Sequence, residues 1–299
     1  MNALRIRGQI TGSIGLALLC SCTTTRDDAA VIPASELPAD VAMDQYAGTG
    51  SHLIVNLRLE SGGEFPCAVD TGAPVSLLPE SLEPGLGKRL GAGTFSTPDS
   101  SKEVLHIYAA PKLYLGHTLL VTGSRIGTWR NSRGILGMDC LRHYCIQLDF
   151  EARRVRFLDP EHLNAADLGQ AFPLVDSPYT MINHCGLFEN KASKTLIDTG
   201  CALDGFVKPG VFNREFREGQ EGTVPEIRNG EFKGTAPGIS IFPKCVWDGE
   251  TYSNLVVGKG LNLIGLRFLA RHKVTFNFPK GMMYLKRTSD SAVFYEGSR

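Results

Sequence analysis

The stretch FPCAVDTG at residues 65–72 has a shortened copy, LIDTG, at residues 196–200. In both places an apolar run leads into the same tripeptide, Asp70-Thr71-Gly72 and Asp198-Thr199-Gly200, so that the two aspartates lie 128 residues apart. A short apolar run that ends in Asp and Gly indicates a buried β-strand followed by a tight turn. The sequence therefore predicts two such strands and turns.

A second motif follows each tripeptide at the same distance. Ile135-Leu136-Gly137 places its glycine 67 residues after Asp70, and Leu263-Ile264-Gly265 does the same after Asp198. Apolar positions continue the 128-residue offset, for example at 148–150 and 276–278. Two unrelated turns could match once by accident, but the shared spacing favours an internal duplication with units of roughly 110 residues.

Short strands dominate the pattern within each unit. The chain has 33 Gly and 16 Pro among 299 residues, which is typical of a mainly β protein with many tight turns. Short helical turns are expected at 138–143 and 267–272, and a short helix at 161–168. Strands are expected at 51–58, 65–69, 105–115, 119–121, 144–150 and 155–158.

Composition and charge narrow the functional class. Lys and Arg number 31, and so do Asp and Glu, which argues against a nucleic-acid-binding protein. Apolar residues make up 42% of the chain, as expected of a folded globular protein.

The N-terminus has the layout of a secretory signal. Arg5 and Arg7 precede a short apolar run at 10–19, which is too short to span a bilayer. The following Leu19-Cys20-Ser21-Cys22 resembles a bacterial lipoprotein box, which implies lipid attachment at Cys22. Ordinary cleavage near Ser21 without a lipid is the alternative. We expect an envelope protein anchored by its lipid on the periplasmic or extracellular side of a membrane, with residues 22–50 as a tether.

Two acidic turns from duplicated units suggest one shared site. If the halves face one another about a twofold axis, Asp70 and Asp198 meet on that axis. Two carboxyls in contact cannot both ionise easily, so they would share one proton.

These motifs resemble those of the retropepsin/pepsin clan of aspartic proteases. Residues 65–76 resemble the active-site segment, residues 134–141 resemble the clan's second motif, and the similarity extends over roughly residues 50–287. The resemblance implies a two-lobed, mainly β acid-protease fold with pseudo-twofold symmetry. It also implies a monomeric aspartic endopeptidase that hydrolyses a peptide or protein substrate, without a cofactor or a metal.

Site residues follow from the same resemblance. Asp70 and Asp198 would be the catalytic dyad that activates one water molecule; which of them acts as base stays open. Thr71 and Thr199 would hydrogen-bond across the axis. The other supporting positions are Gly72, Ala73, Gly200, Cys201, Gly137 and Gly265.

Two supporting positions depart from the pepsin type. Members of that type carry Ser or Thr three residues after each catalytic Asp, whereas this chain has Ala73 and Cys201. Alanine donates no hydrogen bond and a thiol donates weakly, so we expect dyad pKa values above those of pepsins and activity at mildly acidic pH. Because these two hydroxyl donors are missing, the alternative that the chain is a peptide-binding or scaffold lipoprotein that does not cleave stays open. A processing protease with a single envelope substrate is a third possibility.

A covering flap is expected at 90–110, around the turn at 97–101; a plain surface hairpin is the alternative. Residues 225–238 lie in a comparable place of the second unit.

Other polar residues carry weaker hypotheses. Cys140, His143 and Cys145 lack a second ligand pair for zinc. Three cysteines in each lobe leave the disulfide pairing open. Cys201 fits a small buried residue better than a nucleophile, and Asp139 and Asp204 are interpreted as surface or turn acids.

The predicted organisation is signal peptide 1–21, tether 22–50, N-terminal lobe 51–160, connection 161–170, C-terminal lobe 171–287 and tail 288–299.

Overall fold

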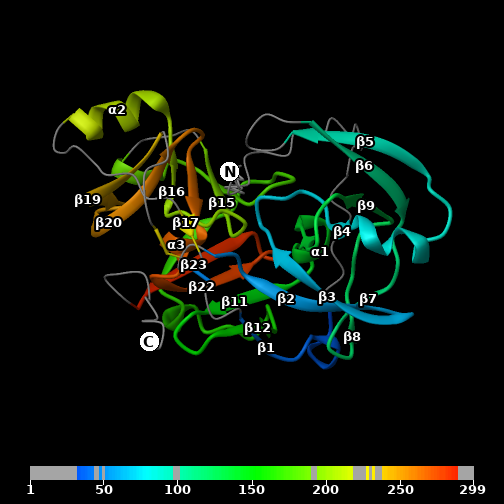
Figure 1. Ribbon diagram of the computed structural model, residues 1–299. Coiled ribbons are helices and arrows are strands. Elements are labelled where there is room, and N and C mark those ends of the chain that lie inside the picture. The colour runs from blue at the N-terminus through cyan, green and yellow to red at the C-terminus, as the bar shows by residue number, and fades with distance from the viewer. Residues whose placement is uncertain are drawn as a thin grey trace, which may run out of the picture.

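The computed structural model describes residues 32–43, 47–48, 51–96, 102–189, 194–217, 227–228, 231–232 and 238–288. The fold is mainly β, as predicted, with three larger sheets and one short hairpin sheet (Figure 1). Its α-helices are short: α1 (Met138–Leu141), α2 (Pro209–Arg217) and α3 (Leu266–Leu269). The 3₁₀-helices are η1 (Ala34–Glu36), η2 (Glu80–Gly85), η3 (Ala165–Asp167) and η4 (Leu187–Glu189).

The first half of the chain builds a nine-stranded sheet in the order β5-β6-β9-β4-β10-β3-β2-β7-β8. Alternating burial along β2 shows why this sequence forms a strand, since Val55, Leu57 and Leu59 point into the core. The strands are β2 (Ile54–Leu59), β3 (Gly62–Val69), β4 (Leu77–Pro79), β5 (Gly91–Ser96), β6 (Lys102–Ala109), β7 (Leu113–Leu115), β8 (Thr118–Leu119), β9 (Arg125–Trp129) and β10 (Gly134–Leu136).

The second half builds a six-stranded sheet in the order β14-β15-β21-β16-β20-β19, with α2 beside it (Figure 1). A separate pair, β17 (Ile227–Arg228) and β18 (Glu231–Phe232), falls in the segment compared above with the flap. The strands of the sheet are β14 (Met181–Ile182), β15 (Thr195–Asp198), β16 (Gly205–Val207), β19 (Ile239–Trp247), β20 (Glu250–Lys259) and β21 (Leu263–Gly265).

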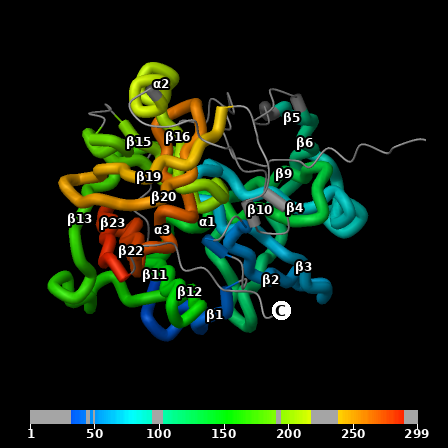
Figure 2. The backbone as a smooth tube through the Cα atoms, turned by 60° about the vertical axis from the view of Figure 1, so that its left-hand side comes forward, coloured from blue at the N-terminus to red at the C-terminus, as the bar shows by residue number. Residues whose placement is uncertain are grey.

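Both halves contribute strands to the third sheet, which runs from β23 down to β1 in the lower centre of Figure 1 and on the lower left of Figure 2. Its order is β1-β12-β11-β22-β23-β13, and the halves join where β11 pairs antiparallel with β22. One main apolar core includes residues from both halves, among them Leu57, Leu148 and Phe276. The strands are β1 (Val41–Ala42), β11 (Cys145–Asp149), β12 (Arg154–Leu158), β13 (Gln170–Pro173), β22 (His272–Asn277) and β23 (Met282–Arg287).

The same pairing order recurs around the two Asp-Thr-Gly segments. In the first half β3 pairs parallel with β10, which pairs antiparallel with β4. In the second half β15 pairs parallel with β21, which pairs antiparallel with β16. Each aspartate therefore comes at the end of a strand whose parallel neighbour carries the second motif.

Several predicted elements need correction. The single strand expected at 105–115 is divided into β6 and β7, because Pro111 has no N–H for a strand ladder. Strand β9 was not expected, and the helix expected at 161–168 is reduced to η3. Within the part of the chain described, no helix combines the length and apolar character needed to cross a membrane.

Candidate active site

Asp70 and Asp198 stand at equivalent ends of strands and are both buried. Asp70 follows β3, and Asp198 is the last residue of β15; their exposed fractions are 3% and 0%. In each tripeptide the glycine N–H donates to the Oδ1 of its own aspartate, at 2.8 Å in both loops. Each carboxylate is thus oriented by the turn that follows it.

The glycines bring each loop against the carboxyl of the other loop. A Cβ placed on Gly72 would lie 2.5 Å from Cγ of Asp198, and one on Gly200 would lie 2.5 Å from Cγ of Asp70. Real Cβ atoms do not approach so closely, so a side chain at either glycine would collide with the opposite aspartate. The two predicted acidic turns therefore meet.

Thr71 and Thr199 connect the loops reciprocally. The Thr71 N–H donates to Oγ1 of Thr199 at 3.0 Å, and the Thr199 N–H donates to Oγ1 of Thr71 at 3.1 Å. The two hydroxyls then donate across the contact, Thr71 to the Ile197 carbonyl and Thr199 to the Val69 carbonyl, both at 2.7 Å. All four hydrogen bonds are buried, which fixes the distance between the loops.

The charge state of Asp198 reflects burial and its neighbour. Burial raises the pKa of Asp198 well above the usual range of an aspartate, and the charge of Asp70 and a hydrogen bond with it raise that pKa further. Hydrogen bonds from the Gly200 and Cys201 amides act in the opposite direction. Oδ2 of Asp198 is buried and accepts no hydrogen bond from an ordinary donor of the described residues. The raised pKa means that Asp198 keeps its proton to higher pH than an ordinary aspartate does.

Ala73 and Cys201 lie directly behind the aspartates and are buried. Their N–H groups donate to the backbone carbonyls of Asp70 and Asp198, at 3.3 and 3.2 Å. Burial raises the pKa of the Cys201 thiol well above its usual value, and the charge of Asp198 raises it further. The thiol is therefore neutral, as expected of a small buried residue and not of a thiolate nucleophile.

Gly137 and Gly265 leave room for the loops. A Cβ on Gly137 would lie 2.5 Å from the Val75 carbonyl oxygen, and one on Gly265 would lie 2.3 Å from the Leu203 carbonyl oxygen. The clearance predicted for these two glycines is present in the structure.

The interpretation of Asp204 as a surface or turn acid is wrong, and Asp139 is in an intermediate position. Asp204 is completely buried between Arg267 and Arg271, whose guanidinium groups lie 2.9 and 3.2 Å from its carboxylate. Asp139 is half-buried in α1 and accepts a hydrogen bond from Ser76 at 2.6 Å. A buried charge requires a partner. The feature of the sequence that points to a partner for Asp204 is the pair of arginines, four residues apart, that follows Gly265.

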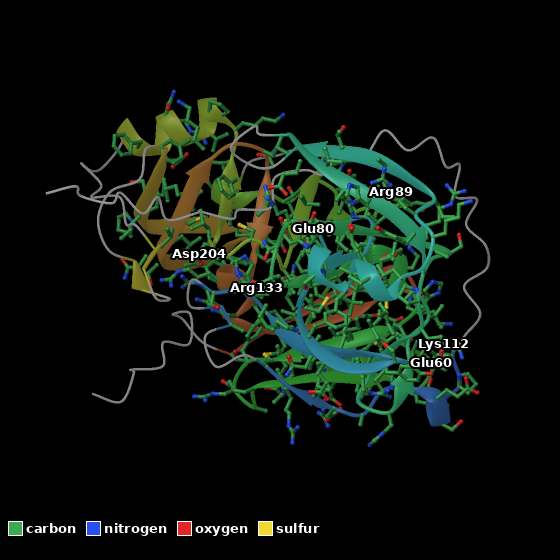
Figure 3. The ribbon with its side chains drawn as sticks, turned by 45° about the vertical axis from the view of Figure 1, so that its right-hand side comes forward. Glu60, Glu80, Arg89, Lys112, Arg133 and Asp204 are labelled. Atoms are coloured by element: carbon green, nitrogen blue, oxygen red, sulfur yellow. The ribbon has the colours of Figure 1, made fainter. Side chains whose placement is uncertain are left out.

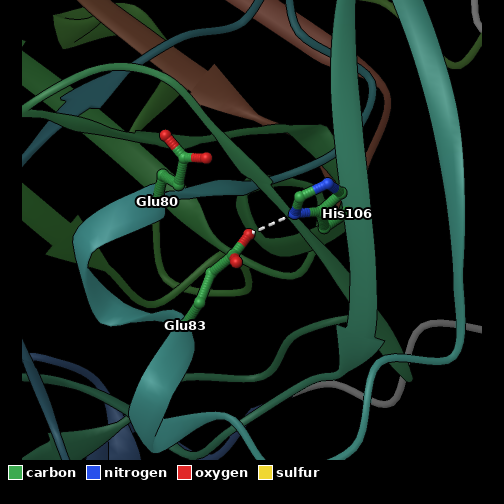
Figure 4. Close-up of side chains that lie close together, drawn as sticks. All are labelled: Glu80, Glu83 and His106. Carbon is green, nitrogen blue, oxygen red and sulfur yellow. Dashed lines mark hydrogen bonds and ion pairs between the residues drawn. The ribbon is translucent and has the colours of Figure 1, made fainter.

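The described cysteines form no disulfide with one another, where the sequence had left the pairing open. All six described cysteines are buried free thiols, namely Cys67, Cys140, Cys145, Cys185, Cys201 and Cys245. Among described residues, the one group of three metal-type side chains within reach of a single ion is Glu80, Glu83 and His106 (Figure 4). His106 and Glu83 form an ion pair at 2.7 Å, and Glu83 also accepts from the Thr128 hydroxyl. This cluster connects η2 to β6 and β9.

Two predictions reach beyond the described residues. The predicted lipid attachment at Cys22 lies outside them. The β5–β6 hairpin forms in the segment expected to be either a flap or a plain surface hairpin, but its turn at 97–101 also lies outside the described residues.

No protein-family model matches this chain, and no curated protein matches it as a relative.

Proposed function

We propose that this protein is an aspartic endopeptidase of the retropepsin/pepsin clan, with Asp70 and Asp198 as its catalytic dyad. The contact between the two Asp-Thr-Gly loops carries the proposal, because each loop glycine packs against the buried carboxyl of the opposite loop, and the charge of Asp70 helps to raise the pKa of Asp198. Such a pair is suited to acid–base catalysis on a water molecule at mildly acidic pH.

The proposed fold is two-lobed with a pseudo-twofold axis. Its support is the 128-residue offset, which separates the hydrogen-bonded residues Thr71 and Thr199 and also Gln147 and Thr275. Gln147 on β11 lies directly opposite Thr275 on β22, and its side-chain amide donates to the Thr275 hydroxyl at 3.0 Å. Equivalent positions of a duplicated chain meet one another where a twofold axis passes.

The proposed mechanism needs only the dyad and one water. In the proposed resting state the two carboxyls share one proton; which of them acts as base stays open, because a coupled pair titrates as a unit. The ionised carboxylate takes a proton from the water as the water oxygen attacks the scissile carbonyl carbon. The protonated carboxyl donates a hydrogen bond to the carbonyl oxygen, and a proton then passes to the leaving amine as the C–N bond breaks. No covalent intermediate forms.

The proposed substrate is an extended peptide that lies across the dyad under the β5–β6 hairpin. The proposed location is the bacterial envelope, with a lipid at Cys22; support comes from the N-terminal sequence. A peptide-binding scaffold that does not cleave is the second candidate, because Ala73 provides no hydroxyl beside its aspartate.

A peptide library incubated with the purified chain between about pH 3 and about pH 7 tests the proposal. Asp70→Asn and Asp198→Asn should each lower kcat by roughly 10²–10⁴-fold. Asp167→Asn, at an exposed acid of η3, is the matched control and should leave kcat unchanged. Cleavage by both dyad variants at the wild-type rate would refute the dyad, and binding without cleavage by the wild type would favour the scaffold.

A further inference from the structure

Two side-chain pairs lie directly behind the loops at equivalent positions of the two halves. Ser76 and Asp204 each lie six residues after an aspartate of the dyad. Their partners Asp139 and Arg267 each lie two residues after the glycine of the second motif. All four positions obey the 128-residue offset, although the side chains differ in chemistry.

The first pair is a neutral hydroxyl with a carboxylate. Ser76 is 1% exposed; its Oγ donates to Oδ1 of Asp139 at 2.6 Å and accepts from the Gly137 N–H at 3.0 Å. The Met138 N–H adds a bond to the Ala73 carbonyl at 2.8 Å. These hydrogen bonds hold the segment that follows Asp70 against the first turn of α1.

The second pair is an ion pair in the same place. Oδ2 of Asp204 accepts from Nε of Arg267 at 2.9 Å and from the Val256 N–H at 2.7 Å, while Oδ1 accepts from Arg271. The Leu266 N–H donates to the Cys201 carbonyl at 2.8 Å, as Met138 does to Ala73. Figure 3 shows Asp204 in the interior, whereas the ion-paired Glu60 and Lys112 lie at the periphery.

We infer that the Ser76–Asp139 and Asp204–Arg267 pairs have the same role, although their chemistry differs: each sets the position of one dyad carboxyl. Each pair is here called a loop tie. Ser76 and Asp204 are therefore positioning residues for Asp70 and Asp198. The inference rests on the proposed function.

A loop tie acts on the carboxyls through a short, tightly packed backbone. Only five residues separate each aspartate from its tie. The Val75 and Leu203 carbonyls within those segments pack against Gly137 and Gly265, and each loop glycine packs against the opposite carboxyl. Because the segment has so little free space, a movement at the loop tie is transmitted along the backbone to the aspartate. Loss of a loop tie therefore displaces one dyad carboxyl relative to the other.

The first experiment uses Ser76→Ala, with Ser76→Thr as the conservative variant and Ser61→Ala, at an exposed turn, as the matched control. The full chain, purified in detergent, is assayed for kcat and KM. The ¹³C resonances of the Asp70 and Asp198 carboxyls are followed through a pH titration, with the two dyad variants used for assignment. Ser76→Ala should lower kcat roughly 10- to 100-fold with KM nearly unchanged, and should move the carboxyl titration. Ser76→Thr should restore both, and Ser61→Ala should change neither.

The second experiment transplants the first tie into the second half. Asp204→Ser alone leaves two buried arginines without their carboxylate, and is expected to lose activity or to unfold. Asp204→Ser combined with Arg267→Asp recreates the Ser–Asp pair, leaves Arg271 beside the new carboxylate, and should recover folding, kcat and the titration. A double variant no better than Asp204→Ser would overturn the equivalence of the two ties.

A lowered melting temperature in Ser76→Ala, with wild-type kcat and carboxyl titration, would overturn the positioning role while the protease proposal stood. If the wild type cleaves no peptide, the protease proposal fails, and the carboxyl titration of Ser76→Ala still decides whether the tie positions the aspartates.

Discussion

The amide of Thr71 donates to the hydroxyl of Thr199, and the amide of Thr199 donates to the hydroxyl of Thr71. Each hydroxyl is at once an acceptor for the opposite amide and a donor to a carbonyl of the opposite strand. The two halves of the chain are thus hydrogen-bonded to each other beside the buried carboxyls, and not only through the shared sheet.

Removing one of these hydroxyls should weaken both the fold and the site. Thr71→Val keeps the shape of the side chain but leaves the Thr199 N–H and the Ile197 carbonyl without a partner. We expect the free energy of unfolding to fall by about 1–3 kcal/mol for each buried group left unsatisfied. Urea unfolding of Thr71→Val and Thr71→Ser measures this change. The serine variant keeps the hydroxyl and should be close to wild type. A loss confined to Thr71→Ser, with Thr71→Val as stable as wild type, would show that the methyl group is what matters.

The loop glycines should not tolerate even one added methyl group. In Gly200→Ala the new Cβ would come 2.4 Å from Oδ2 of Asp70, and in Gly72→Ala it would come 2.5 Å from Cγ of Asp198. Overpacking of this kind typically costs about 1–3 kcal/mol and displaces the carboxyls.

Peptide cleavage and thermal unfolding of Gly72→Ala and Gly200→Ala test this prediction. Gly85→Ala is the matched control, since a Cβ there meets nothing within 4 Å. Wild-type turnover in both loop variants would contradict the close approach of the two loops.

The sequence was sufficient to predict the parts of the site that depend on spacing. The constant offset predicted that the two acidic turns meet, whereas Thr71 and Gly137 were expected as supporting residues because of the resemblance to the retropepsin/pepsin clan. It did not predict the burial of Asp204, because an isolated acid between apolar residues does not reveal that Arg267 and Arg271 face it in three dimensions. Strand β9 was missed for a similar reason: it is stabilised by its parallel pairing with β4, which local alternation does not encode.

The raised pKa of Asp198 should make stability fall as pH rises. An aspartate with a raised pKa binds its proton more tightly in the folded state than in the unfolded chain. Its contribution to stability is therefore fully present below the unfolded pKa and is lost as pH rises through the folded pKa. Asp198→Asn should remove this dependence and should exceed the wild type in melting temperature at neutral pH.

Melting curves of both proteins from about pH 3 to about pH 8 provide the measurement. Parallel curves for wild type and Asp198→Asn would show that Asp198 ionises normally. Asp167→Asn, at an exposed acid, controls for the loss of one negative charge.

Restoring the missing hydroxyls should shift activity toward lower pH. In Ala73→Ser combined with Cys201→Ser, hydroxyl donors beside the aspartates favour the ionised form and lower the dyad pKa values. A hydrogen bond to a charged group is worth about 1.5–3 kcal/mol, so the shift in the pH–rate profile should be on the order of one pH unit. An unchanged profile would mean that burial alone sets the dyad titration. Ser76, which donates to Asp139, stays unaltered in this variant.

The Glu83–His106 ion pair should stabilise the β5–β6 hairpin only while Glu83 is ionised. Burial opposes the charge of Glu83, but hydrogen bonds from Thr128 and His106 outweigh it, so the pKa of Glu83 lies below its usual value. Stability from this pair is present above the unfolded pKa of a glutamate and is lost as pH falls through the lower folded pKa. Glu83→Gln should therefore speed amide hydrogen exchange in β6 at neutral pH and have little effect at strongly acidic pH.

Glu80→Gln, one turn earlier in η2, is the matched control (Figure 4). Equal exchange rates in wild type and Glu83→Gln at neutral pH would mean that strand pairing with β9 alone holds the hairpin in place.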